Sequence, residues 1–285
     1  MSPKPWRWSG RSRSTAEDTV DEDARPSRLL ELAAAHATGA LYLNGRWGGT
    51  IFLIRGRIAQ VESLLTPGVE ALLLRPTYPD EHRWADLIPA LRRGETEAVT
   101  AAAAQLLHRP ATSPVEVEIL RRTALADAAL AALGRVVPET ARTRSRFRPG
   151  EKHWCEPVRA ISVAEVLAEV RRRQGVLARM TLGVQPERPV RRVPKLPIER
   201  MRLTATQWNI ARWADGNNTP LDIAWLLGHG VFATTVAAHQ LARLGVLTVD
   251  PDLSESHPLG LVPARHATSF VRAAEPSART AGPHQ

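Results

Sequence analysis

A run of apolar residues interrupted by glycines, 39–63, constrains the fold of this 285-residue chain more than any other feature. The glycine-containing pairs in the run supply the positive φ angles that tight turns between strands require. The expected strands are residues 40–43, 50–54 and 57–63, with turns at Asn44-Gly45, Gly48-Gly49 and Arg55-Gly56. We therefore predict a small β-meander, in which the glycines act through backbone geometry and bind no ligand.

Helical spacing of apolar residues surrounds this meander. A short helix is predicted to open at Ser27, and a longer one after Ser113-Pro114, where Glu116 completes the start signal. The expected helices after the meander are 68–74, 80–93, 95–107 and 113–133. The last of them carries an apolar stripe that we expect to be core: Ile119, Leu120, Thr123, Leu125, Ala126, Leu130 and Leu133.

The middle of the chain is basic and then rich in proline. Residues 142–212 hold seventeen Lys and Arg against six Asp and Glu, a surplus of eleven in a chain whose net charge is +9. We predict a basic strand within 142–147 and a helix over 162–174, started by a Ser162/Glu165 capping box. Four prolines in 183–197 predict irregular structure and a domain boundary. The charge fits a polyanionic partner, or a solvated linker.

The C-terminal region has the element order of a winged helix. Helices are predicted at 204–214, 220–227 and 231–244, followed by a strand at 246–249. Thr219 and Pro220 mark the start of the middle helix, and Gly228-His229-Gly230 marks the turn after it. Trp208 and Trp225 lie among apolar neighbours, so we expect both to face inward.

These elements predict an α+β protein, with a small N-terminal β-meander and its helices joined to a mostly helical, winged-helix-like C-terminal domain. The expected segments are a disordered tail at 1–26, a first domain at 27–180, a basic Pro-rich linker at 181–197, a winged helix at 198–250 and a flexible tail at 251–285.

The glycine-punctuated run resembles the PatA-type N-terminal domain, a bacterial family of unknown biochemical function. The matching residues are Gly39, Leu41, Leu43, Gly49, Ile51, Leu53, Gly56 and Ile58. The likeness covers residues 27–75 and implies a signalling or regulatory protein, because such domains accompany receiver, repeat or DNA-binding modules. The stretch LTATQWNIARWADGNNTPLDIAWLLG is similar to the winged-helix domains attached to actinobacterial proteins of this kind.

The predicted recognition helix, VFATTVAAHQLARL, has few of the donors that read base edges. Most of the affinity for DNA would then come from basic residues that contact phosphate. The predicted DNA-binding residues are Arg191, Arg192, Lys195, Arg202, Thr234, Thr235, His239, Gln240 and Arg243. Two hypotheses remain: a transcriptional regulator that binds DNA, and an interaction adaptor whose winged helix contacts protein.

No pattern of catalytic or metal-ligating residues stands out, so we expect neither enzymatic activity nor a cofactor or metal. His153 and Cys155 flank Trp154 in an expected extended segment and do not form a nucleophile–base pair, while His229 and His239 lack neighbouring ligands. With a single cysteine, no intrachain disulfide is possible. The absence of an apolar leader or long apolar run predicts a cytoplasmic protein with no membrane partner. The sequence leaves open whether the protein forms a homodimer.

Overall fold

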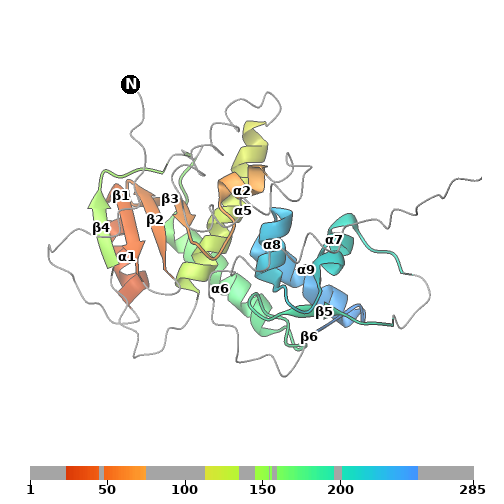
Figure 1. Cartoon of the computed structure of the whole chain (residues 1–285). Helices are drawn as coiled ribbons and strands as arrows, with labels where there is room; N and C mark the ends of the chain where they lie inside the picture. The colour runs from red at the N-terminus through yellow and green to blue at the C-terminus, as the bar shows by residue number, and fades with distance from the viewer. Residues whose placement is uncertain are drawn as a thin grey trace, which may run out of the picture.

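The computed structural model describes residues 24–44, 48–74, 113–134, 145–153, 155, 159–195 and 201–249. Within these residues the chain is an α+β protein, which confirms the predicted fold class: a four-stranded sheet with helices precedes a mainly helical C-terminal part (Figure 1). The helices predicted at 80–93 and 95–107, the tail at 251–285 and residues 1–23 lie outside the described residues.

The predicted meander is present and gains a fourth strand. Strands β1 (Gly39–Leu43), β2 (Gly49–Ile54) and β3 (Arg57–Glu62) are joined in sequence and pair antiparallel. The predicted basic strand is β4 (Ser145–Pro149), which returns about a hundred residues later to pair with β1, giving the order β3-β2-β1-β4. Pro149 is tolerated because β4 is an edge strand.

The β2–β3 turn confirms one predicted role for glycine and corrects another. Arg55 and Gly56 have φ angles of 49° and 74°, so Gly56 avoids the strain that a side chain would bring. A Cβ on Gly56 would also lie 2.3 Å from the carbonyl oxygen of Ala33. The positive φ predicted for Gly49 is wrong. Gly49 is needed instead for close approach, because its Cβ would lie 2.3 Å from the carbonyl oxygen of Glu62.

Helices cover one face of the sheet and enclose the larger core. They are α1 (Ala24–Ala34), α5 (Pro114–Leu133) and α6 (Val163–Ala178). Helix α2 (Val69–Leu74) packs against α5 in a smaller cluster. The predicted caps are confirmed, since Ser113 accepts a hydrogen bond from the Glu116 amide and Ser162 and Glu165 form a capping box. The core residues include Leu29, Leu41, Leu53, Ile58, Leu125 and Val166.

Two N-terminal expectations need correction. Helix α1 begins at Ala24, before the predicted Ser27, because Pro26 falls in the first turn, where its missing amide costs no hydrogen bond. Ile119, predicted to be core, is 59% exposed near the beginning of α5, whereas Leu125 further along that helix is buried. Leu120, in the first half of α5, packs against a smaller core cluster around α2, so the prediction fails at Ile119 and not for that whole half of the helix.

The C-terminal part has its own core. Its elements are β5 (Val190–Arg192), α7 (Ala205–Trp213), α8 (Pro220–Leu227), α9 (Val231–Arg243) and β6 (Leu247–Val249). The core residues are Val184, Val190, Ile210, Ala211, Ala214, Ile223, Ala238, Leu241, Val246 and Leu247. Trp225 is buried as predicted, but Trp208 is 62% exposed on α7, so the inward orientation predicted for it is wrong.

The prediction that residues 183–197 are irregular is also wrong. Strand β5 lies between Pro189 and Pro194 and pairs antiparallel with β6. On its other side, the Val190 and Arg192 amides donate to the carbonyl oxygens of Asn218 and Ala214. The bonding amides all belong to non-proline residues, so prolines can flank this short strand without interrupting it. Since Val184 and Val190 are also core residues, the C-terminal part begins before the predicted boundary at 198.

Candidate nucleic-acid interface

Helices α8 and α9 form a helix-turn-helix. Three residues, 228–230, separate them, and the chain direction bends by 118° between the two helices. Helix α8 begins at a capping box in which Thr219 and Asp222 bond reciprocally, and it ends at Gly228 with φ 62° and ψ 41°. A short glycine-containing turn and a bend near this value are typical of DNA-binding helix-turn-helix motifs.

The small sheet beside this motif departs from the expected winged helix. The partner of the strand after α9 is β5, which precedes α7, and an isolated bridge joins Arg191 to Asp215 between α7 and α8. Strand β5 is therefore central, with β6 on one side and the α7–α8 connection on the other.

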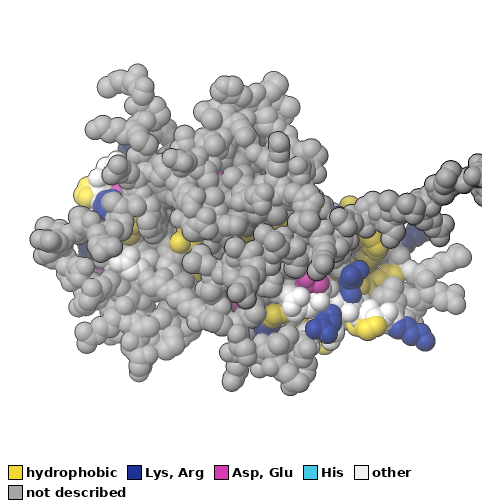
Figure 2. All heavy atoms as spheres, in the orientation of Figure 1, with side chains coloured by type: hydrophobic (Ala, Val, Ile, Leu, Met, Phe, Trp, Pro, Cys, Tyr) yellow, Lys and Arg dark blue, Asp and Glu magenta, His cyan; other side chains and the backbone are white. Residues whose placement is uncertain are grey.

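All five predicted basic contact residues are exposed: Arg191, Arg192, Lys195, Arg202 and Arg243. The first two are successive residues of β5 and so point to opposite faces of the small sheet. The Arg191 guanidinium lies against Gly216, where a Cβ would meet its Nε at 2.4 Å. Figure 2 shows Lys and Arg side chains as separate groups near this end of the molecule, with uncharged and apolar atoms between them.

The side chains of α9 only partly match the prediction. Gln240 is exposed and His239 is half-buried, with its Nδ1 atom buried and without a hydrogen-bond partner. Thr234 and Thr235 are 1% and 0% exposed, and their hydroxyls donate to the carbonyl oxygens of Gly230 and Val231. The prediction that these two threonines contact DNA is therefore wrong, because a β-branched residue on the inner face of α9 fills the core.

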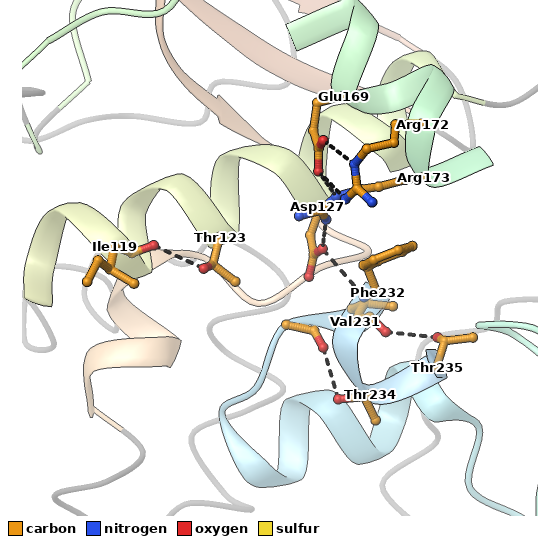
Figure 3. A network of polar contacts seen from close by, with 11 residues as sticks. Ile119, Thr123, Asp127, Glu169, Arg172, Arg173, Val231, Phe232, Thr234 and Thr235 are labelled. Carbon is orange, nitrogen blue, oxygen red and sulfur yellow. Dashed lines mark hydrogen bonds and ion pairs between the residues drawn. The ribbon is translucent and has the colours of Figure 1, made fainter. Parts of the chain in front are cut away.

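A polar network that the sequence analysis missed lies at the first turn of α9 (Figure 3). Asp127 of α5 accepts a hydrogen bond from the Phe232 amide and pairs with Arg173 of α6. Burial raises the pKa of Asp127, while Arg173 and the α9 backbone oppose that rise. Hydrogen bonding by Arg172, and then by Arg173, lowers the pKa of Glu169 to about 2 despite partial burial. The sequence feature that could have indicated this network is Asp127, an acidic residue inside the apolar stripe of the 113–133 helix.

A second group of polar side chains is buried in the N-terminal part. His153 Nε2 lies 2.7 Å from a carboxylate oxygen of Glu62. Burial alone would lower the pKa of His153, but the charge and hydrogen bond of Glu62 outweigh it and raise the value. Burial raises the pKa of Glu70 to about 7 and also raises the pKa of the Cys155 thiol.

This group offers little nucleophilic chemistry. His153 Nδ1 faces the backbone amide of Cys155 at 3.0 Å, and the raised thiol pKa favours the protonated form. Among the described residues, three or more His, Cys, Asp or Glu side chains do not come together in a way that could hold a metal ion.

The N-terminal and C-terminal parts meet along a cleft of about 320 Å³. Its walls include Leu130 and Leu177 from α5 and α6, and Val184, Leu221 and Phe232 from the C-terminal part. In the described part of the chain, no single helix has the length and hydropathy to cross a bilayer, although α8 and α9 together would meet both criteria as a bent pair.

A scan against protein-family models and searches of curated proteins and of solved structures each returned no match to this chain. The resemblance to PatA-type N-terminal domains therefore stays a prediction.

Proposed function

We propose that this protein is a bacterial, non-enzymatic transcriptional regulator whose C-terminal part binds DNA mainly through phosphate contacts. The observation that carries the proposal is a helix-turn-helix bend of 118° with five exposed cations on and around the adjoining small sheet and helix ends. Cations set near a recognition helix neutralise phosphates and position the protein on a duplex. The proposed phosphate contacts are Arg191, Arg192, Lys195, Arg202 and Arg243. Gln240 and His239 are the residues proposed to contact base edges.

The exposed surface of α9 argues for weak sequence preference. Of its exposed residues, Ala233 has no hydrogen-bonding group, and Gln240 and Arg243 lie in the second half of the helix. Direct readout depends on side chains that donate to or accept from base edges. Affinity should therefore depend steeply on salt and only mildly on sequence.

Titration of a labelled duplex at about 50 mM and about 200 mM salt tests the proposal. Replacing Arg191 and Arg192 together with Ala should weaken binding equally on all duplexes and reduce the salt slope by about 2. The matched control replaces Arg28 of α1, which is half-buried, and Arg122 of α5, which is exposed, with Ala. This double variant removes the same charge outside the helix-turn-helix motif. Equal slopes for the two double variants would exclude Arg191 and Arg192 as phosphate contacts. No duplex binding by the wild type at the lower salt would overturn DNA binding.

The second candidate is an interaction adaptor whose C-terminal part contacts a regulatory protein. It is favoured by Trp208, which is 62% exposed on α7, since tryptophan often anchors protein interfaces. If Trp208→Ala leaves duplex binding unchanged while abolishing a defined complex with another protein, the adaptor function is supported.

A further inference from the structure

The beginning of α9 differs from the beginnings of the two helices before it. Helices α7 and α8 are capped by the side chains of Thr204 and Thr219, which belong to their own sequences. The N-cap of α9 is Gly230, which has no side chain to accept a hydrogen bond. The first-turn amides of α9 therefore depend on a partner from elsewhere in the chain.

That partner is Asp127, which lies 105 residues earlier on α5. The residue is 3% exposed, and its Oδ1 accepts from the Phe232 amide at 3.4 Å. A carboxylate at a helix N-terminus is stabilised by the amides and by the positive end of the helix dipole. The fit is close: a Cβ on Gly230 would lie 2.9 Å from both Asp127 Oδ2 and Thr123 Cγ2.

Two arginines of α6 lie beside Asp127 at the same turn (Figure 3). Arg173 pairs with Asp127 and also bonds Glu169 at 2.7 Å, so its guanidinium is fixed between two carboxylates. The Arg173 guanidinium lies 4.6 Å from the centre of the Phe232 ring, and that of Arg172 lies 5.7 Å away. Such cation–π contacts add to the capping bond. We call the contact of Asp127, Arg172 and Arg173 with Gly230 and Phe232 the α9 clasp.

We propose that the α9 clasp is an autoinhibitory contact, in which the N-terminal part occupies the end of α9 that would enter DNA. In helix-turn-helix proteins the N-terminal residues of the second helix contact the base edges. Here Val231 is 6% exposed and Phe232 lies under Arg173, so α5 and α6 cover that turn. DNA and the N-terminal part then compete for one surface, and a signal that loosens α5 and α6 would release the recognition helix. This inference rests on the proposed DNA-binding function.

The test compares full-length variants for duplex binding at low salt and for hydrogen exchange at the Val231 and Phe232 amides. Asp127→Ala removes the cap, and Gly230→Ala forces the two sides apart without changing any charge. The backbone at Gly230 has φ −67° and ψ 137°, which alanine adopts without strain. Both variants should exchange faster at these amides and bind duplex about fivefold to tenfold more tightly, the effect of losing one helix cap on an open–closed equilibrium.

Glu116→Ala is the matched control, because it removes the same charge from an exposed position near the beginning of α5. It should bind duplex more weakly than Asp127→Ala and exchange like the wild type. If exchange is faster in the clasp variants but their affinity equals that of the control, the clasp holds α9 without inhibiting it, and DNA binding stands. Unchanged exchange in Gly230→Ala also overturns the clasp. If neither wild type nor variants bind duplex, both the inference and the proposed function fail.

Discussion

Buried polar side chains find their partners over very different sequence distances in the two parts of this molecule. In the N-terminal part, Arg121 donates to the Ala59 carbonyl 62 residues away, and His153 contacts Glu62 across 91 residues. In the C-terminal part, Thr219 bonds Asp222 and Thr234 bonds Gly230, within four residues. The N-terminal fold therefore depends on charged groups brought together by tertiary packing, whereas the C-terminal helices satisfy much of their polarity locally.

This difference teaches where pH and mutation should act. Removing the distant partner of a buried charge costs more free energy of unfolding than removing a neutral hydroxyl that caps its own helix. Asp127 belongs to both parts, because it lies on α5 and caps α9. Substitutions should therefore lower the free energy of unfolding most at buried charges with distant partners, less at Asp127, and least at a local helix cap.

The largest effect is expected for Arg121→Ala. The Arg121 side chain is 1% exposed, and its loss leaves the Ala59 carbonyl and part of Glu118 without a partner. We expect the free energy of unfolding to fall by about 3–5 kcal/mol, measured by urea denaturation. The control is Arg122→Ala, which removes an exposed arginine that bonds the same Glu118 and should cost under about 1 kcal/mol. If the two variants lost the same free energy of unfolding, the buried long-range contacts of Arg121 would not be what stabilises the N-terminal part.

The next effect is a pH dependence that Glu70 confers on the N-terminal part. Burial raises its folded pKa to about 7, above the ordinary value of 4.5, with the Glu62 carboxylate adding to the rise and His153 opposing it. A raised acid pKa means that the folded state binds the proton more tightly, so stability falls as pH rises from 4.5 to about 7 and then levels off. The loss should be about 3 kcal/mol.

Glu70→Gln keeps the neutral shape and should remove this dependence. The variant and the wild type should have similar stability near the lower end of that range, while the variant should be more stable above the upper end. Thermal unfolding across the range measures the difference. A wild-type curve that stays parallel to that of the variant throughout would contradict the assignment.

Asp127→Ala should cost about 2 kcal/mol in the free energy of unfolding, because it removes a buried charged hydrogen bond shared by α5, α6 and α9. Asp127→Asn should lose less, since its amide oxygen still accepts from the Phe232 amide. Hydrogen exchange should report the loss on both sides of the contact, in α5 as well as in α9. A loss confined to α9 would show that the two parts are not coupled here.

The smallest effect is expected for Thr219→Ala, the local cap of α8. Removing its hydroxyl should cost about 1 kcal/mol in the free energy of unfolding, and Thr219→Ser should restore most of it. Because the bond joins residues three apart, we expect the loss to stay within the C-terminal part. Urea unfolding measures the loss of stability, and hydrogen exchange at α5 amides shows whether it spreads. Faster exchange in α5 would contradict the view that the Thr219 hydrogen bond acts only within the C-terminal part.

Several features of the fold could be predicted because their cause is local. The meander turn at Gly56 needs a positive φ, the capping box at Ser162 joins residues three apart, and Thr219 caps α8 directly before Pro220. Other features could not be predicted, because their cause lies in distant segments. Strand β5 exists because β6 and the α7–α8 connection supply its partners, despite the prolines around it.

The candidate site divides in the same way. The cations of Arg191, Arg192 and Arg243 are exposed as the sequence suggested, since arginine rarely lies buried without a partner. The burial of Thr234 and Thr235 and the exposure of Trp208 depend on how α7 and α9 are rotated about their axes, and only packing fixes that rotation.

By itself the sequence determined where most described strands and helices lie, because turn geometry, capping and apolar spacing act within a few residues. Tertiary structure alone decided which acid caps α9. Gly230 leaves the first turn without a cap of its own, and Asp127 reaches it only when α5, α6 and α9 pack together. A hydrogen bond between residues 105 apart has no local cause, so it depends on the folded arrangement of both parts.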